Sequence, residues 1–446
     1  MANVQPMAAV RYPQSLQTDL ISPPYDVLSA ADKAAYLKKN AHNIVAVDLP
    51  HVPPKTAGPA AAYAAAATTL ESWLQSGVLK RDGKPTLYPY QQTYAHAGVT
   101  YQRRGLFCRV GLEEFGPSGT IHPHEQTFSG PKEDRLLLMR STHANLSPVF
   151  GLYDDATNAV TNRLFEHVAG GPPIATASLP TQDGKGQVLS ELWMVTDAKV
   201  IADVQNLLAD KHLYIADGHH RYSTCLTYRK ELAQSHGGHL PKEHPANFGL
   251  FVLVAMQDPG LIVLPTHRVV SNLQGFSADG FVAKAAGLLK VLPGQFTGGQ
   301  LDELEKRLAG FGPHAMGVYD PAGDRAVVVV PSDSDPLGRL SDDAALAGKS
   351  KEWRQLDVAI LQHLIFDRIV KPHFAGGQDF HWAFPHEAHE VVDLCRSGQY
   401  QAGFVLQPTP LEAVRQLCNA HELMPQKSTF FYPKLATGMV INTLVS

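Results

Sequence analysis

One nine-residue segment constrains the fold more than any other part of this 446-residue chain. It reads Tyr-Ile-Ala-Asp-Gly-His-His-Arg-Tyr over residues 214–222. An apolar, β-forming run stops at Ala216, and five polar or turn-forming residues follow at once. Gly218 has no Cβ, so the backbone can turn there and come close to a ligand. The segment therefore predicts a strand, a tight turn and a helix, with polar side chains gathered at the turn.

The rest of the chain alternates between short strands and helices. We expect helices over residues 58–77, 134–143, 199–208, 222–232, 277–290, 301–310, 354–370 and 410–420. We expect strands over residues 86–94, 101–112, 149–153, 192–195, 212–216 and 402–407, and hairpins over 248–264 and 315–331. Such a pattern is typical of an α+β or mixed α/β protein. We expect a core over residues 1–270 that carries the motifs. A C-terminal α/β subdomain over 271–446 would return a strand and the segment Pro425–Lys434 to that core.

Charge and cysteine content exclude several classes of protein. Lysine and arginine total 38 against 42 aspartate and glutamate, a net charge of -4, which argues against a nucleic-acid partner held by bulk charge. The four cysteines form no C-x-x-C pair, so neither a disulfide scaffold nor a cysteine-rich zinc site is expected. We see no signal peptide and no apolar run long enough to span a membrane, which predicts a cytoplasmic protein. The oligomeric state stays open, and a homo-oligomer is one of the states considered.

The residues at the predicted turn favour an anion site. The first N–H groups of a helix are unpaired and the helix dipole is positive there, which suits phosphate or carboxylate. His219, His220 and Arg221 would add hydrogen-bond donors. Asp217 could hold Mg²⁺ or orient a nucleophile. The alternative is a structural corner in which Asp217 caps the helix and the histidines pack locally.

A second cluster lies in a loop rich in glycine and proline. His124 and Glu125 suit proton transfer or metal binding, and Lys132 and Arg135 suit phosphate. His122, His124 and Thr127 are candidates for substrate binding. The spacing does not match H-E-x-x-H, so a zinc protease is not indicated. The alternative is a solvated loop with an ion pair between Asp134 and a basic neighbour.

Three further places carry candidate residues. His267 and Arg268 follow a predicted strand, and Lys427, Ser428 and Thr429 could contact phosphate. Asp26, directly after Pro23, Pro24 and Tyr25, is a candidate general base. The structural alternatives are a surface pair, a docked C-terminal strand and a turn cap.

Taken together, the motifs resemble a known family. They are S-P-P-Y-D, H-P-H-E-Q-T with K-E-D-R, Y-I-A-D-G-H-H-R-Y, L-P-T-H-R and M-P-Q-K-S-T-F-F-Y-P-K, spread from residue 22 to residue 434. This set looks like a bacterial and archaeal domain-of-unknown-function family, number 1015. The D-G-H-H-R stretch also resembles the central motif of the ParB/sulfiredoxin superfamily, whose members include ParB-type CTP-hydrolysing proteins, sulfiredoxins and free-serine kinases.

The second resemblance implies a fold, a site and an activity. It implies a ParB/sulfiredoxin-like core in which Asp217, Gly218, His219, His220 and Arg221 form the phosphate and metal site. In the kinases an acidic residue acts as base on the serine hydroxyl, and here both Glu125 and Asp26 are candidates. We favour a small-molecule phosphotransferase that uses ATP or ADP with Mg²⁺ on a hydroxyl-bearing metabolite, with free serine as one candidate.

Two alternatives stay open at this point. One is a ParB-like nucleotide-binding regulatory protein. The other is a metal-dependent hydrolase that uses His122, His124, Glu125, His219 and His220.

Overall fold

A computed structural model describes residues 2–126, 129–340 and 343–445. The chain divides into two compact units. The first comprises Met1–Ile262 together with Phe431–Ser446, and the second comprises Val263–Phe430. The chain passes from one unit to the other within β13 (Ile262–Leu264) and again within β20 (Phe430–Tyr432). The segment Asp217–Arg221 therefore belongs to the first unit.

One mixed sheet of nine described strands organises the first unit. Its order is β6-β11-β8-β12-β5-β4-β10-β9, with β1 paired to the far end of β5. The β6–β11 and β8–β12 pairs are parallel, and the other pairs are antiparallel. The strands are β1 (Val4–Gln5), β4 (Tyr88–His96), β5 (Val99–Gly111), β6 (Ile121–His122), β8 (Val149–Tyr153), β9 (Ala175–Pro180), β10 (Gln187–Leu192), β11 (Leu213–Asp217) and β12 (Phe248–Ala255). Every residue of β8 and β12 is buried, as expected for strands covered on both faces.

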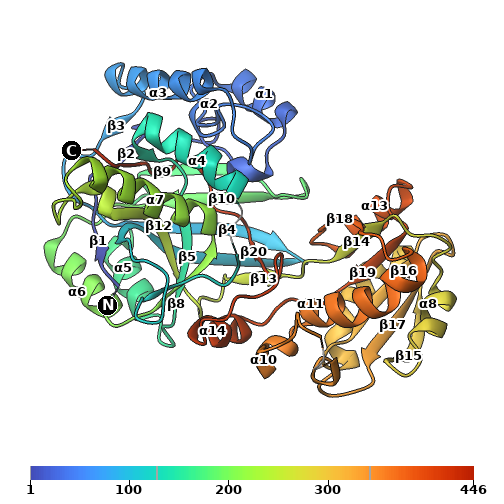
Figure 1. Cartoon of the computed structure of the whole chain (residues 1–446). Helices are drawn as coiled ribbons and strands as arrows, with labels where there is room; N and C mark the ends of the chain where they lie inside the picture. Colours follow the sequence, from blue (N-terminus) through green and yellow to red (C-terminus); the bar gives the residue numbers. More distant parts are fainter. Residues whose placement is uncertain (1, 127–128, 341–342, 446) are drawn as a thin grey trace. The chain divides into compact units, whose positions relative to one another are not determined.

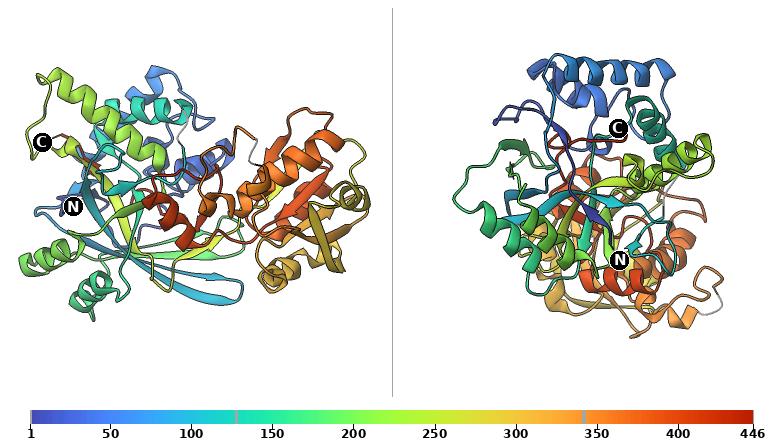
Figure 2. Two further views of the ribbon diagram at one scale, coloured as in Figure 1. Left: turned by 60° about the horizontal axis from the view of Figure 1, so that its bottom comes forward. Right: turned by 90° about the vertical axis from the view of Figure 1, so that its left-hand side faces the viewer.

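Helices cover this sheet in layers. They are α1 (Ala30–Lys39), α2 (Val45–Asp48), α3 (Ala60–Gln75), α4 (Ser129–Thr142), α5 (Ala159–Val168), α6 (Ala198–Leu208) and α7 (His219–Ser235). α7 packs on β8 and β12, α4 packs on α7, and α3 packs on α4 (Figure 1). Short strands β2 (Val10–Arg11), β3 (Lys80–Arg81), β7 (Ala144–Asn145) and β21 (Asn442–Thr443) pair beside these layers. Figure 2 shows β4 and β5 as one long hairpin.

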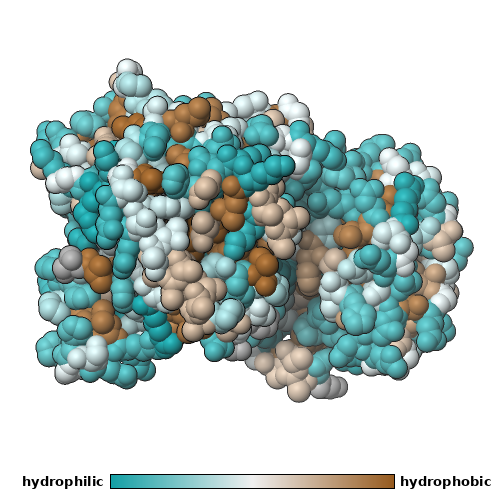
Figure 3. Space-filling view, turned by 90° about the horizontal axis from the view of Figure 1, so that it is seen from above, coloured by the Kyte–Doolittle hydropathy of each residue, from teal (hydrophilic) through white to brown (hydrophobic). Residues whose placement is uncertain are grey.

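The sequence explains the outer layer directly. α3 is rich in alanine, the best helix former, and Tyr63, Ala66, Leu70 and Trp73 recur at helical spacing and are buried. They pack with Leu138 of α4 in one apolar cluster. The outward alanines of α3 remain exposed, and Figure 3 looks down on this face, where hydrophobic residues lie scattered among hydrophilic ones.

The second unit has a sheet of its own. The six described strands follow the order β15-β17-β16-β19-β14-β18. They are β14 (Arg268–Ser271), β15 (Leu289–Phe296), β16 (Met316–Asp320), β17 (Arg325–Pro331), β18 (His381–Ala383) and β19 (Ala402–Val405). The helices are α8 (Ala278–Lys284), α9 (Leu301–Arg307), α10 (Lys351–Arg354), α11 (Asp357–Ile360), η6 (Leu361–Val370), α12 (Lys371–Phe374), α13 (Ala388–Arg396) and α14 (Leu411–Asn419). The two units together confirm a mixed α/β protein.

Three sequence-based expectations are wrong. The hairpin over 248–264 does not form, because β12 has β5 on one edge and β8 on the other and leaves no edge for β13. The helix over 277–290 ends at Lys284, since Gly287 has a φ of +84° and β15 then begins as a partner of β17. The helix over 354–370 is interrupted near Leu356, which has an extended backbone.

Two further features concern membrane spans and thiols. Among the described residues, no helix has the length and apolar character that crossing a membrane requires. All four cysteines are buried free thiols. Burial raises the pKa of the Cys225 thiol to about 12, so it stays protonated.

Candidate functional site

The site begins where β11 meets α7. β11 ends at Asp217 after an irregularity in its pairing with β8, and α7 begins at His219. Gly218 between them has φ +92° and ψ 26°, a left-handed conformation that favours glycine. A Cβ at this position would lie 2.9 Å from Nε of Arg221. The glycine therefore permits both the turn and the close approach of the arginine.

The start of α7 is an electropositive surface. The N-cap residue, Gly218, has no side chain that could cap this helix end. The helix runs for 17 residues, long enough to develop the dipole fully at its N-terminus. An anion placed here would meet backbone donors and a favourable field.

Asp217 lies between two cations that come from different parts of the chain. Its Oδ2 accepts a hydrogen bond from Nη2 of Arg221 at 2.8 Å, and its Oδ1 lies 3.5 Å from Nζ of Lys434. The side chains of Asp217, Arg221 and Lys434 are 27%, 11% and 18% exposed. We call these three residues the open cluster, because solvent reaches every member.

A buried arginine holds the terminal segment that carries Lys434. Arg103 on β5 is 2% exposed and donates to the carbonyl oxygens of Tyr432, at 3.1 Å, and Pro433, at 2.6 Å. It also donates to Oε1 of Gln92, whose Nε2 donates to the carbonyl of Lys434 at 3.2 Å. Burial penalises the positive charge of Arg103 unless it is hydrogen-bonded, and these bonds satisfy it. Arg103 therefore fixes the backbone of residues 432–434 beside the sheet.

Two buried imidazoles support the turn as neutral groups. Nδ1 of His124 donates to the carbonyl of Ile215 at 2.7 Å, and its backbone N–H donates to Nε2 of His219 at 3.3 Å. Burial lowers the pKa of His124 and lowers that of His219 well below its ordinary value. Cationic contacts to phosphate would therefore come from Arg221 and Lys434 rather than from His219. His220, the next residue, is half-buried.

Both candidate carboxylate bases lie in the first unit near the open cluster. Oε1 of Glu125 is 3.9 Å from Nε2 of His124, and this side chain is 21% exposed. Asp26 lies in η1 (Tyr25–Val27), the turn that follows Pro23 and Pro24. Burial acts to lower the pKa of Arg221, but Asp217 and then Asp26 raise it. Glu125 and Asp217 raise the pKa of His124, and Lys434 lowers it. These groups therefore share one electrostatic environment.

His122 belongs to a different cluster. Its Nε2 lies 2.6 Å from Nδ1 of His212, and the two rings stack at 4.9 Å. The ring of Tyr214 also stacks on His122, with centroids 5.5 Å apart. Although only Pro123 separates His122 from His124, the two histidines contact different partners. Among the described residues, no three His, Cys, Asp or Glu side chains are grouped so as to hold a metal ion.

Arg135 forms a second charged group, which we call the sealed cluster, with Asp48 and Asp134. Its guanidinium donates to the carbonyl of Asp48 at 2.7 Å and reaches Oδ2 of Asp134 at 2.8 Å. Tyr63 and His51 also bond Asp134, at 2.8 and 3.1 Å. This is the ion pair of Asp134 with a basic neighbour that the sequence offered as the alternative to phosphate binding.

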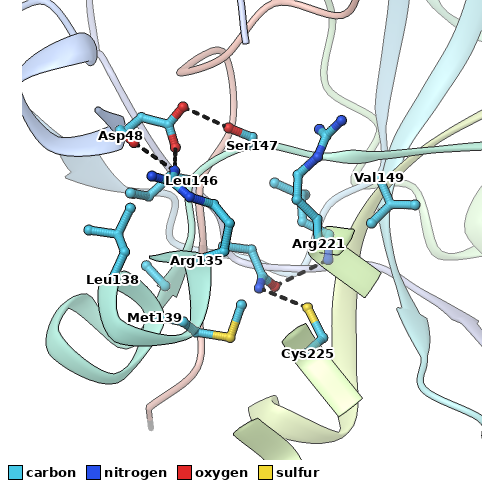
Figure 4. A pocket seen from close by; sticks show the side chains of 12 residues that line it. Asp48, Arg135, Leu138, Met139, Leu146, Ser147, Val149, Arg221 and Cys225 are labelled. Atoms are coloured by element: carbon cyan, nitrogen blue, oxygen red, sulfur yellow. Dashed lines mark hydrogen bonds and ion pairs between the residues drawn. The ribbon is translucent and has the colours of Figure 1, made fainter. Parts of the chain in front are cut away.

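A small cavity lies between the two clusters. Arg135, Asp48 and Arg221 line it together with apolar residues of α4 (Figure 4). Its volume is about 40 Å³, which is room for water and far too little for a nucleotide. A ligand must therefore approach the open cluster from elsewhere.

Several predicted residues lie outside this grouping. His267, Arg268, Lys427, Ser428 and Thr429 belong to the second unit. There Arg268 donates to the carbonyl of Lys427 at 2.9 Å, and His267 accepts from the N–H of Leu406 at 3.1 Å. The hydroxyl of Ser428 donates to the carbonyl of Pro425. Lys132 is half-buried on α4, and Thr127 lies outside the described residues.

The sequence did not single out Lys434. It stands five residues after Thr429, in the same motif, and no local pattern distinguished it from Lys427. Tyr432-Pro433 was a signal that could have pointed to Lys434. Proline restricts the backbone, so the side chain that follows it extends from a fixed position.

The family model described as "Protein of unknown function (DUF1015)" matches residues 4–359. The chain belongs to this family. The match contains residues 217–221 and ends before the terminal segment that carries Lys434. No curated protein matches the chain.

Solved structures show only distant similarity to this DUF1015 chain. Two structures of free serine kinase variants, one in complex with AMP and one with ADP, have TM-scores of 0.32 and 10% identity, covering 75% of this chain and 92% of theirs. A conserved hypothetical protein from Pyrococcus furiosus has a TM-score of 0.31 and 12% identity, covering 75% and 95%. Similarity at this level does not establish a shared fold, so the geometry of the chain itself has to support any function.

Proposed function

We propose that this protein is a small-molecule phosphotransferase that uses a nucleotide with Mg²⁺ to phosphorylate a hydroxyl group. The open cluster at the uncapped start of α7 is the observation that supports it. Phosphoryl transfer depends on cations that neutralise phosphate oxygens and on a residue that orients the attacking hydroxyl. The open cluster supplies the cations, and Glu125 and Asp26 are the candidates for the residue that orients the hydroxyl.

The cations would bind the phosphates of the nucleotide. Lys434 offers a flexible ammonium, and Arg221 a guanidinium whose other hydrogen bond goes to the carbonyl of Pro148. The backbone N–H groups at Gly218, His219 and His220 would add donors at the helix start. The 3.5 Å separation of Lys434 and Asp217 is longer than a hydrogen bond, so exchange of the carboxylate for a phosphate oxygen would cost little.

Asp217 suits Mg²⁺ in this scheme. Magnesium prefers oxygen ligands and is usually held by one or two carboxylates together with substrate phosphates, so it needs no larger protein cluster. Asp217 is a part-exposed carboxylate beside the phosphate-binding cations. When bound, the ion would neutralise charge on the phosphate oxygens during transfer.

A carboxylate would orient the acceptor. The acceptor oxygen forms a new bond to the terminal phosphorus while the bond to the leaving phosphate oxygen breaks. The hydroxyl proton passes to Glu125 or Asp26, and the shortened nucleotide leaves. Both carboxylates lie near the open cluster, and their roles remain separate hypotheses for mutagenesis.

The D-G-H-H-R motif extends this proposal to a structural class. We infer that β11, the Gly218 turn and α7 form a ParB/sulfiredoxin-like core and that free serine is the first acceptor to test. We place the reaction in the cytoplasm with nucleotide and a small metabolite as partners. A metal-dependent hydrolase would need a set of protein ligands, and the described residues offer none.

The direct test is a transfer assay followed by ³¹P NMR. The protein is incubated with Mg²⁺ and ATP or ADP, first with free serine and then with other small hydroxyl compounds. We expect a phosphomonoester signal and a shortened nucleotide in equal amounts. Nucleotide hydrolysis without an ester would instead indicate a ParB-like regulator, and no nucleotide binding at all would refute the proposal.

Variants assign the roles. Asp217→Asn and Lys434→Met should lower turnover about 100-fold or more, the scale of losing one preorganised charge contact. Asp203→Asn and Lys199→Met are matched controls, because both residues lie on α6 and Asp203 pairs with Arg163 at 2.9 Å. Of Glu125→Gln and Asp26→Asn, the variant of the true base should lose turnover and keep its nucleotide affinity.

A further inference from the structure

A pocket of about 190 Å³ lies in the first unit beside the open cluster. It is several times the roughly 30 Å³ share of a water molecule. Its lining comes from the N-terminal stretch from Pro23 to Tyr36, from strands β4, β9 and β10 with the turn after β9, and from the terminal stretch from Tyr432 to Ala436. These segments are far apart in the sequence, so the pocket is a product of the fold.

Most of the lining residues are apolar or aromatic. Pro24, Leu28 and Val188 are buried in its walls, and Tyr36 and Tyr432 contribute aromatic rings. Two polar side chains of the lining, Gln92 and Ser190, already bond side chains outside it or the backbone. Gln92 bonds Arg103 and the carbonyl of Lys434, and Ser190 bonds the hydroxyl of Tyr90 at 2.8 Å. Such a pocket suits a flat, weakly polar ring better than a charged group.

Two walls of the pocket lead directly to charged residues. Pro24 is followed by Tyr25, whose ring centroid lies 3.8 Å from the guanidinium carbon of Arg135. Asp26 comes next, and its negative charge raises the pKa of Arg221. Pro433 is followed by Lys434, which lines the pocket and also lies 3.5 Å from Asp217. A molecule that carries an apolar ring at one end and phosphates at the other would match this arrangement of an apolar pocket next to charged residues.

We infer that this pocket is the nucleoside subsite, which holds the base of the nucleotide while its phosphates lie at the open cluster. The inference rests on the proposed function and adds to it the place where the base binds. A small hydroxyl amino acid would fit poorly, because its ammonium and carboxylate each need an opposite charge. Asp32, the acidic residue of the lining, already accepts the hydrogen bonds of the Ser29 cap at 2.6 and 2.8 Å.

The test compares two ligands that share phosphates but differ in the base. Binding of ADP and of inorganic pyrophosphate, each with Mg²⁺, is measured by calorimetry on the full chain. Val188→Trp fills the pocket from β10. We expect it to weaken ADP at least tenfold and to leave pyrophosphate within twofold. Lys434→Met should weaken both ligands.

Leu189→Trp is the matched control. Leu189 is the next residue of β10, and its side chain is 39% exposed on the other face of the strand. It should change neither affinity. Val27→Asp provides a second variant in case Val188→Trp does not fold, because Val27 is 36% exposed and also lines the pocket. It should weaken ADP more than pyrophosphate.

The outcomes separate the two proposals. If Val188→Trp and Val27→Asp leave ADP binding intact, or weaken ADP and pyrophosphate equally, the base binds elsewhere although the proposed function stands. The same conclusion follows if they raise only the KM of the acceptor. If the unaltered protein binds neither ligand, the proposed function fails and this inference fails with it.

Discussion

The first unit contains two charged clusters of similar composition and opposite accessibility. In the sealed cluster, the side chains of Arg135, Asp48 and Asp134 are 6%, 4% and 1% exposed. In the open cluster, every member is more than a tenth exposed, and its lysine comes from a distant segment. Each cluster places an arginine against at least one carboxylate, yet the two clusters differ in how far solvent reaches them.

Burial explains the difference in role. Burial acts to lower the pKa of Arg135, but Asp48, Tyr25 and Asp134 outweigh it and raise that pKa. The arginine therefore stays charged, and removing either partner would leave an uncompensated charge inside the protein. In the open cluster solvent reaches Asp217 and Lys434, so their ion pair is partly screened and adds less to stability than the sealed pairs. The comparison teaches that two ion-paired clusters in one unit can differ in solvent access, and only the more exposed one offers groups that a ligand can reach.

The largest expected effect is on stability. Asp48→Asn should lower the free energy of unfolding of the first unit by about 3 kcal/mol, the lower end for a broken buried pair because Asp134 still faces Arg135. Asp217→Asn should lower it by about 1 kcal/mol or less. Hydrogen exchange of α4 and α7 amides at increasing urea concentration measures both values in this unit. Equal losses in the two variants would contradict the distinction.

A second effect concerns the turn at Gly218. Gly218→Ala forces a side chain into the left-handed region, at a cost of about 1–2 kcal/mol, and presses a Cβ against Arg221. We expect weaker binding of Mg²⁺-pyrophosphate, measured by calorimetry. Gly237→Ala is the control, because its φ is +80° and no atom lies within 4 Å of its Cβ. It should lose similar stability and keep its affinity, and a parallel loss of affinity would mean that strain alone weakens binding.

The smallest expected effect concerns how the free energy of unfolding depends on pH. The pKa values of His124 and His219 are lowered by burial, so the unfolded chain takes up protons below about pH 6.5 that the folded chain does not. This stability is fully present above that pH and is lost as pH falls toward the folded pKa values. The slope is at most about 1.4 kcal/mol per pH unit for each histidine.

His219→Gln tests the histidine contribution, because glutamine keeps an acceptor for the N–H of His124 but does not titrate. Unfolding free energies between pH 7 and 5 should vary less steeply in this variant. An unchanged slope would show that other groups carry the acid dependence.

Local patterns predicted the elements that carry the site. The apolar run to Ala216, the Asp217-Gly218 turn and the following helix were readable because neighbouring residues determine them. The buried stripe of α3 was equally local. β15 was not predicted, since its pairing with β17 depends on residues over thirty positions away.

Convergence of distant side chains was the part that local patterns could not supply. Arg135 was expected to bind phosphate, but Asp48 and Tyr25, far back in the chain, enclose it. Lys434 reaches Asp217 only because Arg103 anchors the backbone before it. Such contacts follow from the fold of the whole first unit, so no window of sequence reveals them.

The anchoring of Tyr432 and Pro433 by Arg103 also determines when the open cluster is completed during synthesis. During synthesis the sheet that carries Arg103 leaves the ribosome early, whereas Lys434 follows only after the entire second unit has been translated. Until then the open cluster lacks its lysine. A nascent or prematurely released polypeptide would therefore hold a nearly finished sheet in which Lys434 has not yet reached Asp217.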